Sequence, residues 1–451
     1  MKAMHFMLGV AAVAMTTSVY AAPPAMPELD RELAAIAADP AHPLASLSVL
    51  AVRSGRVVYH REFGFRSIDN DDPARSTPAD HRTLYRIASI SKLVTTLGVM
   101  RLRESGLLDL DRDVGDYLGW ALRNPNFPDA PITLRMLLSH TSSMRDDAGY
   151  YWEAGLGVRL RDVLVPGGKL YGAGAMWAAT AKPGVYFQYA NLPWGVVGTI
   201  VERVTGKRFD RAMQRLVLDP LGLHGGFHPV DFSAADLADT AALYRKRVEK
   251  DGREIWDSAG PWVPQVDDYR SERPVPRTAA DYEIGTNGTL FGPQGNCRLS
   301  AAGLAIIMQM LMRDGVHAGK RFLKPSSVAL MRTPQWRHDG IGANGNNTFG
   351  SHRELMNAWG LGMQVFLDRA GPGTGDRLVE GGGFTGVGHL GDAWGLTSAL
   401  VFDPRTRNGM IFLTGGPGFN PETHPGVYGS MYRHEERILT ALHRNGLSAK
   451  R

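Results

Sequence analysis

The sequence predicts an α/β protein of the α+β type, with one antiparallel sheet flanked by helices and a second, mostly helical part. Two observations lead to this fold class. Segments with the composition of β-strands occur near both ends of the chain, at residues 47–65, 361–367, 389–402 and 409–413. Residues 107–335, between them, contain helical stretches separated by proline and glycine. Both ends of the chain are therefore expected to build one sheet, with a site in the cleft beside the helical part.

One hairpin and several helices can be predicted from short stretches of the sequence. Residues 47–65 alternate and turn at Ser54-Gly55, which predicts a β-hairpin. A helix is expected after Ser89, because apolar residues recur there on one face and Gly106 can end it. Further helices are expected at residues 194–204, 300–313 and 431–443.

The first residues predict a secretory signal peptide over residues 1–21. Lys2 supplies a positive charge, residues 6–15 are apolar but too short to span a bilayer, and residues 19–21 end in a small residue suited to cleavage. The mature protein is then a single domain over residues 22–451, periplasmic or secreted in a bacterium, without a stable membrane span. An uncleaved membrane anchor is the alternative reading.

Composition sets further bounds on this chain of 451 residues. Residues 22–86 and about 336–451 are assigned to the sheet part, and residues about 87–335 to the helical part. The formal net charge of +5 is small and both signs are interspersed, so no nucleic-acid partner is expected. The mixed-charge segment 245–254 is interpreted as a solvated turn. Cys297 is the single cysteine, so an internal disulfide is precluded. We expect Cys297 to be a small packing residue.

The segment Ser89-Ile90-Ser91-Lys92 places a hydroxyl and an amine three residues apart at the expected start of a helix. Residues at this spacing share a helix face, so the two side chains can meet. A serine hydroxyl is a weak nucleophile until a neighbouring base accepts its proton, and a lysine can take part in that transfer. The pattern therefore indicates a nucleophilic serine, although so short a motif also arises without function.

Two later segments carry side chains that suit the same chemistry. Tyr189-Ala190-Asn191 offers a phenol that can transfer a proton and an amide that can accept from Lys92 and donate to a substrate carbonyl. His389-Leu390-Gly391 follows a glycine-rich run, and a glycine there lets a substrate backbone approach a strand edge. The plainer alternatives are a buried tyrosine in a turn and a hydrogen-bonded core histidine.

These motifs together resemble the serine β-lactamase and penicillin-binding superfamily, in particular its group of class C β-lactamases, DD-peptidases, D-aminopeptidases and related esterases. The resemblance covers residues from about 40 to about 440 and implies a β-lactamase/transpeptidase-like fold. The matching segments, in the family's order, are Arg86–Lys92 (RIASISK), Thr133–Ser143 (TLRMLLSHTSS), Pro183–Asn191 (PGVYFQYAN), Gly198–Gly206 (GTIVERVTG) and Gly388–Gly391 (GHLG).

The resemblance implies a role for each matching residue. Ser89 is the nucleophile that becomes acylated, and Lys92 and Tyr189 form the general-base and general-acid network, with the division between them left open. Asn191 orients the substrate. The backbone amides of Ser89 and Asp392 are expected to form the oxyanion hole.

His389 and Gly391 take the substrate-binding positions on the strand. His389 stands where lactamases usually carry a lysine, which weakens the case for recognising the carboxylate of a β-lactam. Asp392 places an acid beside the expected oxyanion hole. If its side chain faces the cleft, it disfavours an anionic substrate and suits an amine; if it points away, it caps or pairs with a neighbour. The second orientation is the one we favour from the sequence.

Other residues near these motifs have structural interpretations. His140, in the loop His140-Thr141-Ser142-Ser143, is expected to be hydrogen-bonded rather than catalytic. Tyr150, Tyr151 and Trp152 either line the substrate cleft or pack against the core or surface. Trp359 and Trp394 are expected to be packing residues. The sequence contains neither a Gly-x-Ser-x-Gly nor a His-Glu-x-x-His pattern.

The sequence therefore predicts an exported serine hydrolase that forms an acyl-enzyme on Ser89 and needs neither metal nor cofactor. Its substrate is a small molecule or peptide with an ester or amide bond, as for an esterase, a D-amino-acid peptidase or a DD-carboxypeptidase. One alternative is a class C-type β-lactamase. Another is a non-catalytic protein of the same fold that binds muropeptides or a partner. Acyl transfer to an acceptor other than water is a third.

Overall fold

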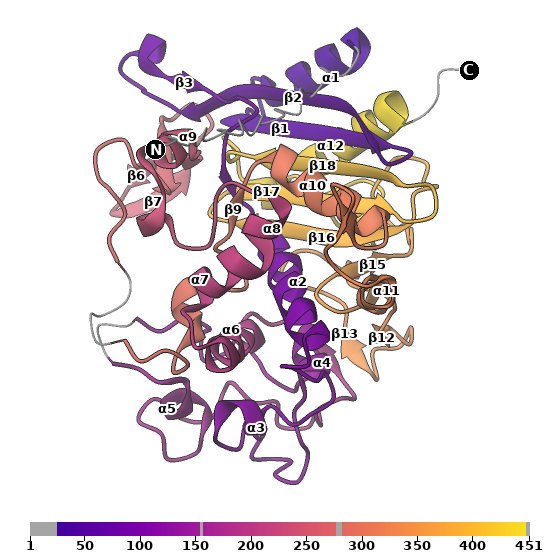
Figure 1. Ribbon diagram of the computed structural model, residues 1–451. Helices are drawn as coiled ribbons and strands as arrows, with labels where there is room; N and C mark the ends of the chain where they lie inside the picture. Colours follow the sequence, from indigo (N-terminus) through magenta and orange to yellow (C-terminus); the bar gives the residue numbers. More distant parts are fainter. Residues whose placement is uncertain (1–24, 154–156, 277–281, 448–451) are drawn as a thin grey trace, which may run out of the picture.

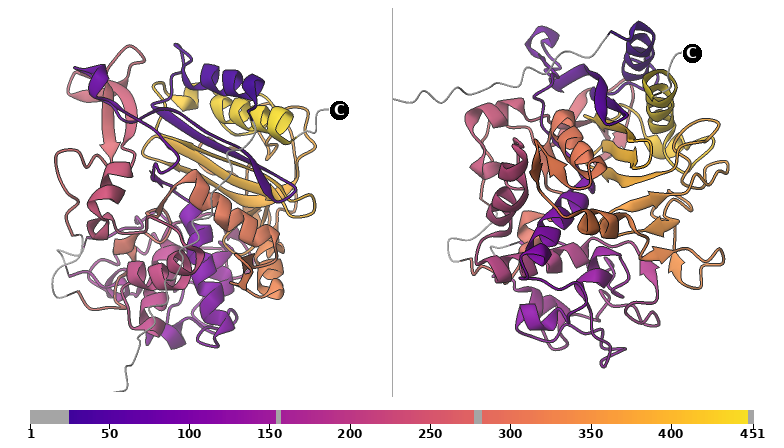
Figure 2. Two further views of the ribbon diagram at one scale, coloured as in Figure 1. Left: turned by 45° about the horizontal axis from the view of Figure 1, so that its top comes forward. Right: turned by 45° about the vertical axis from the view of Figure 1, so that its right-hand side comes forward.

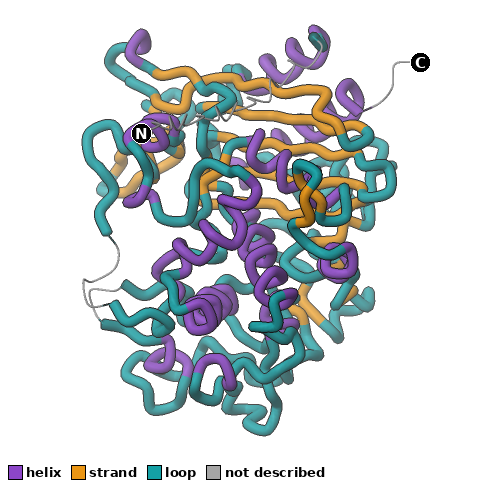
Figure 3. Tube along the Cα trace, in the orientation of Figure 1, coloured by secondary structure: helices purple, strands orange, loops and turns teal. Residues whose placement is uncertain are grey.

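The computed structural model describes residues 25–153, 157–276 and 282–447 and has the expected mixed architecture (Figure 1). The predicted signal peptide, residues 1–21, lies outside the described residues. Strands gather in one half of the molecule, and many of the helices and long loops lie in the other (Figure 3).

The main sheet is antiparallel and takes strands from both ends of the chain. The two ends of the chain meet where β1 pairs with β18, which sets Leu47 opposite Thr414. The hairpin predicted at residues 47–65 is β1 and β2, and it turns at Ser54-Gly55. In spatial order the nine strands are β12 (Trp336–Arg337), β14 (Ala358–Trp359), β15 (Gln364–Phe366), β16 (Gly386–Ala393), β17 (Leu396–Asp403), β18 (Asn408–Thr414), β1 (Ser46–Arg53), β2 (Arg56–Ser67) and β3 (Thr77–Pro78).

Both faces of this sheet are covered by helices. Successive side chains of a strand point to opposite faces, and in the central strands both sets are apolar, so each face needs a partner. Met410 and Phe412 of β18 belong to a core with α1 (Pro27–Ala37) and α12 (Arg433–Ala441), which lie side by side (Figure 2). Ile411 and Leu413 belong to the larger core on the opposite face, with α2 (Ile90–Glu104) and α10 (Ala301–Met312). The helix after Ser89 and the two at residues 300–313 and 431–443 are thus present near their predicted bounds.

The part between β3 and β12 contains the remaining helices. The longest is α6 (Leu192–Thr205), which begins directly after Asn191 and ends at Gly206 in the left-handed conformation. The others are α3 (Gly115–Leu118), α4 (Leu134–Leu138), α5 (Leu160–Leu164), α7 (Phe209–Met213), α8 (Asp219–Leu221), α9 (Ala234–Asp239) and α11 (Pro325–Arg332).

This part is not purely helical. Small sheets are formed by β4 (Tyr85–Arg86) with β9 (Arg298–Leu299), by β5 (Phe187–Gln188) with β13 (Gly345–Asn346), by β10 (Val316–His317) with β11 (Lys320–Arg321), and by β6 (Leu243–Lys250) with β7 (Arg253–Trp256) and β8 (Trp262–Val266). The mixed-charge segment 245–254, interpreted from the sequence as a turn, therefore lies mostly in strands, with its turn only at Asp251-Gly252. The guanidinium groups of Arg245 and Arg247 lie over the ring of Trp256, and such stacking stabilises a hairpin whose sequence lacks apolar alternation.

The segment 389–402 contains two strands rather than one. β16 and β17 form a hairpin that turns at Trp394-Gly395, where both residues have positive φ. Trp394 is 53 % exposed at this turn, so the prediction that it is a packing residue is wrong, whereas Trp359 is buried, as a packing residue should be. Among the described residues, no helix is both long and apolar enough to cross a membrane.

Candidate active site

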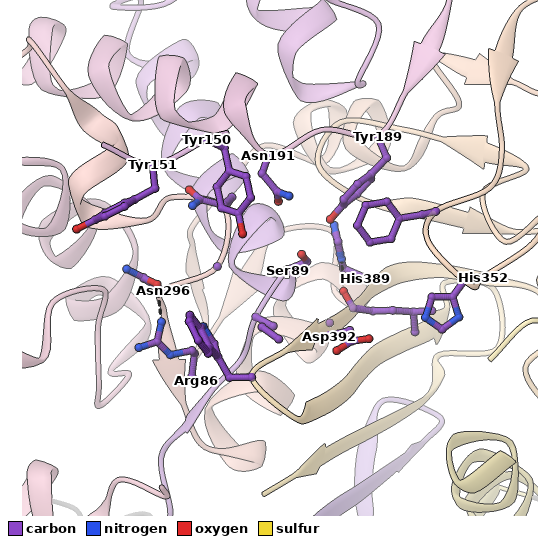
Figure 4. Close-up of a pocket in the computed structure, with 18 of the residues that line it drawn as sticks. Arg86, Ser89, Tyr150, Tyr151, Tyr189, Asn191, Asn296, His352, His389 and Asp392 are labelled. Carbon is purple, nitrogen blue, oxygen red and sulfur yellow. Dashed lines mark hydrogen bonds between the residues drawn. The ribbon is translucent and has the colours of Figure 1, made fainter. Parts of the chain in front are cut away.

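Ser89 lies at the start of α2 and next to strand β16 (Figure 4). Ala88, which precedes it, has a φ of 45°, and this turn presents Ser89 to the cavity. A Cβ at Gly391 would lie 2.8 Å from the carbonyl oxygen of Ile87 and 3.1 Å from the Cβ of Ala88. Glycine at residue 391 is therefore what allows the helix start and the strand to approach each other closely.

Lys92 lies one turn into α2, fully buried, with its amine on Ser89. Its Nζ donates to Ser89 Oγ at 2.9 Å, to Asn191 Oδ1 at 2.8 Å and to the carbonyl oxygen of Gln294 at 3.2 Å. Burial lowers the pKa of Lys92 to about 7, although the negative charge of Asp146 opposes that shift. Near neutral pH a large fraction of this amine is unprotonated and able to accept the Ser89 proton.

Tyr189 completes the cluster between β5 and α6. Its phenol interacts with the Ser89 hydroxyl, and Lys92 Nζ lies 4.9 Å from the centre of its ring. Burial raises the pKa of Tyr189 despite that contact, so the phenol stays protonated at neutral pH. His140 stacks on the same ring at 4.4 Å and accepts from the backbone N–H of Ala190 through Nδ1, which is the structural role predicted for it.

Asn191 is fixed by a carboxylate that sequence reasoning missed. Asp146 accepts from the backbone N–H of Asn191 at 2.8 Å, from its Nδ2 at 2.9 Å and from the backbone N–H of Leu192 at 2.9 Å. An anion is favoured at this position, the N-terminus of α6. The contact to Nδ2 determines which way the amide faces, so its Oδ1 accepts from Lys92, and the second Nδ2 hydrogen remains for a ligand. No spacing in the sequence links Asp146 to Asn191.

His389 lies on β16 with its ring against Trp359. Its Nδ1 lies 2.5 Å from the carbonyl oxygen of Leu390, and its Nε2 has no hydrogen-bond partner among the described residues. Burial, together with the nearby charge of Lys92, lowers the pKa of His389 to about 3. The histidine is therefore neutral at pH 7 and does not replace the charge of a lysine at this position.

Asp392 is exposed and lines the cavity. The sequence-based prediction that its side chain points away from the cleft is therefore wrong. Its carboxylate interacts with His352 (Figure 4). The backbone of β16 is also accessible here, because its pairing with β15 ends at Gly388 and the described residues supply no other strand on that edge. The edge that carries His389, Gly391 and Asp392 can therefore receive a substrate backbone.

The cavity around Ser89 has a volume of about 980 Å³. Tyr150 and Tyr151 line it on the opposite side of Ser89 from His352 in Figure 4, as the first of the two alternatives predicted. Trp152 packs against the core instead. Trp394 also lines the cavity. A volume of this size suits a small-molecule or peptide ligand. Within residues 25–153, 157–276 and 282–447, no group of three or more His, Cys, Asp or Glu side chains is arranged to hold a metal ion.

Comparison with known proteins agrees with this architecture. The chain is 26 % identical over 183 residues to "Penicillin-binding protein 4*" of Bacillus subtilis (strain 168), a match that covers 39 % of this chain and 36 % of that protein. The chain therefore spans about a third of the length of this relative.

Solved structures extend the similarity to nearly the whole chain. The D-amino acid amidase from Ochrobactrum anthropi SV3, complexed with D-phenylalanine, has a TM-score of 0.60 at 17 % identity, covering 92 % of this chain and 99 % of its own. EstCE1, a hydrolase with promiscuous acyltransferase activity, has a TM-score of 0.56 at 21 % identity, covering 92 % and 98 %. These likenesses show a shared fold. The family model for Beta-lactamase matches residues 30–427, so the protein belongs to the beta-lactamase family.

Proposed function

We propose that the protein is a serine hydrolase that forms an acyl-enzyme on Ser89 and cleaves an ester or amide bond, as an esterase or a D-amino-acid peptidase of the DD-carboxypeptidase kind. The observation that carries this proposal is the contact between Lys92 and Ser89. A buried amine with a pKa of about 7 lies 2.9 Å from the hydroxyl oxygen, within reach for proton transfer.

In the first step Lys92 accepts the proton of Ser89 while Oγ attacks the substrate carbonyl carbon. The carbonyl oxygen becomes an oxyanion, which the backbone N–H groups of Ser89 and Asp392 stabilise. The Ser89 N–H suits this role because it lies at the N-terminus of α2, where the helix dipole favours negative charge. Asn191, Gly391 and the neutral His389 position the substrate along β16.

In the second step the bond to the leaving group breaks and that group takes a proton. Tyr189 supplies it as a protonated phenol and is reprotonated by the ammonium of Lys92, so the net transfer is from Ser89 to the leaving group. Water then attacks the acyl carbonyl carbon while Lys92 accepts a proton from it, and the bond to Ser89 Oγ breaks as Oγ takes that proton, which releases the acid and restores the free enzyme. This assignment makes Lys92 the general base and Tyr189 the general acid, in accordance with the opposite pKa shifts of the two groups.

Electrostatics of the cavity favour uncharged or cationic substrates over β-lactams. Arg86 is the one lysine or arginine among the described residues that line the cavity, and its guanidinium donates to Asp267 and Asn296. His389 is neutral, and Asp392 is a carboxylate next to the proposed oxyanion hole. A β-lactam carboxylate would therefore lack a free cation to pair with.

A substrate panel tests this proposal. p-Nitrophenyl esters, D-aminoacyl p-nitroanilides, D-alanyl-D-alanine peptides and nitrocefin are assayed with the wild type and with Ser89→Ala. We expect turnover of an ester, anilide or peptide that Ser89→Ala abolishes, with slower turnover of nitrocefin. Faster turnover of nitrocefin than of every other substrate would establish the β-lactamase alternative. A protein that turns over nothing and resists labelling at Ser89 would establish the binding-protein alternative.

We also propose that the protein is exported through the signal peptide at residues 1–21. The support is the charge and hydropathy pattern of those residues. Expression of the full chain in a Gram-negative host, followed by N-terminal sequencing of the periplasmic fraction, tests it. A mature N-terminus at residue 22 is expected, and an intact chain that stays in the cytoplasm would contradict export.

A further inference from the structure

We infer that the cavity contains a subsite for a flat apolar ring of the substrate, such as a phenyl group, and that Trp394 is the residue that selects it. The inference rests on the proposed function only for the identity of the ligand as a substrate, because binding to the subsite can be measured without turnover. It narrows the substrate class for which the ester or amide chemistry at Ser89 would operate.

The backbone of Trp394 is the first part of the argument. Trp394 and Gly395 are the two residues of the turn between β16 and β17, and their φ angles are 58° and 97°. A two-residue turn with positive φ at both positions favours asparagine, aspartate or glycine at the first of them. A bulky side chain is uncommon in the left-handed conformation, and residues held there against their preference gather at ligand and active sites. The turn itself therefore gives no reason for a tryptophan at residue 394.

Packing gives no such reason either. Trp394 belongs to none of the apolar cores that the described residues form, although its neighbour Ala393 packs against the largest of them. Trp394 stays exposed and lines the cavity that contains Ser89. An apolar side chain in this position gains on ligand binding the burial that folding does not supply.

Trp394 also lies close to the reacting groups. It comes two residues after Asp392, whose backbone N–H is assigned to the oxyanion hole, and a strand rises about 3.3 Å per residue. Its ring can therefore contact a substrate group that is only a few bonds away from the carbonyl carbon that Ser89 attacks.

Other aromatic rings in the cavity wall indicate that this group is flat. Tyr150 is 42 % exposed and lines the cavity (Figure 4). Phe349 lines it as well and lies edge-on to the ring of Tyr189, with 4.7 Å between the ring centres. Offset-stacked and edge-to-face aromatic pairs attract each other beyond the effect of the buried area. A phenyl group can form such pairs, whereas a cyclohexyl group is at least as apolar but cannot.

The experiment measures the dissociation constants of phenylpropanol and cyclohexylpropanol by isothermal titration calorimetry, for the wild type and for two variants. In the wild type we expect phenylpropanol to bind about fivefold more tightly, the effect of one aromatic pair. Trp394→Asn should reduce this preference to less than about twofold. Phe65→Leu is the matched control and should keep the preference, because Phe65 is a 40 % exposed ring on β2, outside the cavity.

The melting temperature of Trp394→Asn separates ligand binding from a structural role. Asparagine accepts the left-handed conformation of this turn, so the variant should melt at or above the temperature of the wild type. A clearly lower melting temperature would assign Trp394 to the stability of the hairpin and would overturn the inference.

Equal affinities of the two alcohols in the wild type would also overturn the inference. So would a preference that Trp394→Asn keeps, or one that Phe65→Leu removes equally, because a specific contact with Trp394 would then not explain it.

The link to catalysis is measured separately, as ratios of kcat/KM. Ethyl phenylpropanoate and ethyl cyclohexylpropanoate test the acyl side of the ester, and benzyl acetate and cyclohexylmethyl acetate test the alcohol side. We expect a preference for the phenyl compound on one side, which Trp394→Asn removes. Turnover without a preference on either side would overturn the claim that the subsite holds a substrate. A preference in binding without Ser89-dependent turnover of any ester or amide would contradict the proposed function and leave the subsite standing.

Discussion

At the scale of single residues, the protonation of Lys92 is the property on which the proposed chemistry depends. Its pKa of about 7 results from burial and is far below the usual value for lysine. Acylation requires the neutral amine, so kcat/KM for p-nitrophenyl acetate should rise as the pH increases through about 7. A pH profile of wild-type kcat/KM between pH 5 and pH 9 measures this. A rate that stays flat across that range would exclude Lys92 as the base.

Asp146 determines both the orientation of Asn191 and part of the charge near Lys92. Its negative charge raises the pKa of Lys92, so Asp146→Asn should lower that pKa and shift the rising limb of the pH profile to lower pH. The plateau rate should fall about tenfold, the equivalent of one lost hydrogen bond to a charged group. Asp147→Asn, which alters an exposed neighbouring carboxylate, should change neither quantity. An unshifted limb in Asp146→Asn would mean that this carboxylate acts only on local structure.

Gly391 allows β16 to lie close to the start of α2, which carries Ser89. In Gly391→Ala the new Cβ would lie 2.4 Å from Ser398 Oγ and 2.8 Å from the carbonyl oxygen of Ile87. The strand must then move away from Ser89, and we expect kcat/KM to fall about a hundredfold. Gly303→Ala in α10 is the control, since its Cβ would meet nothing closer than 3.6 Å. Near-normal activity of Gly391→Ala in a steady-state ester assay would show that this spacing is not critical.

At the scale of elements, one buried ion cluster joins three strands. Asp267, directly after β8, accepts from Arg86 of β4 at 2.8 Å and from Arg298 of β9 at 2.6 Å. Burial opposes ionisation, but the two guanidinium groups outweigh it and hold the pKa of Asp267 well below its usual value. Arg86 also lines the cavity, so the cluster fixes one of its walls.

Removing this carboxylate would leave two buried cations unpaired. Asp267→Asn should lower the free energy of unfolding by about 3–5 kcal/mol, measured by urea denaturation at pH 7. The contribution of Asp267 is fully present above its unfolded pKa, near 3.8, and is lost as the pH falls towards the lower folded value. Asp268→Asn, at a more exposed pair with Arg270, should cost less than about 1 kcal/mol. Similar losses in the two variants would contradict the importance of burial.

The elements that the sequence predicted are those with a one-sided pattern. Residues 47–65 alternate in polarity, and the helix after Ser89 repeats apolar residues on one face, so each could be identified locally. The hairpin of β6 and β7 could not, because most of its residues are charged and its stabilising contacts are guanidinium groups over Trp256. Trp394 was misjudged because only the pairing of β16 with β17 places it at a turn.

At the scale of the whole molecule, the site is assembled by the sheet and the helical part together. Ser89 and Lys92 could be named from four consecutive residues, and Tyr189 from a second motif. Asp146 could not, since it acts through a tertiary contact with Asn191, which lies 45 positions later in the chain. Motifs thus located side chains that the fold brings together around Ser89, whereas the carboxylate that orients Asn191 could be found only in the structure.

The central claim is that Ser89 becomes covalently modified with the help of Lys92. Labelling with a fluorophosphonate, followed by intact mass and peptide mapping, measures this directly. We expect one adduct per chain on Ser89, none in Ser89→Ala, and labelling slowed at least about a hundredfold in Lys92→Ala that still unfolds cooperatively. An adduct on another residue, undiminished labelling of Ser89→Ala, or a near-normal labelling rate in folded Lys92→Ala would contradict the account.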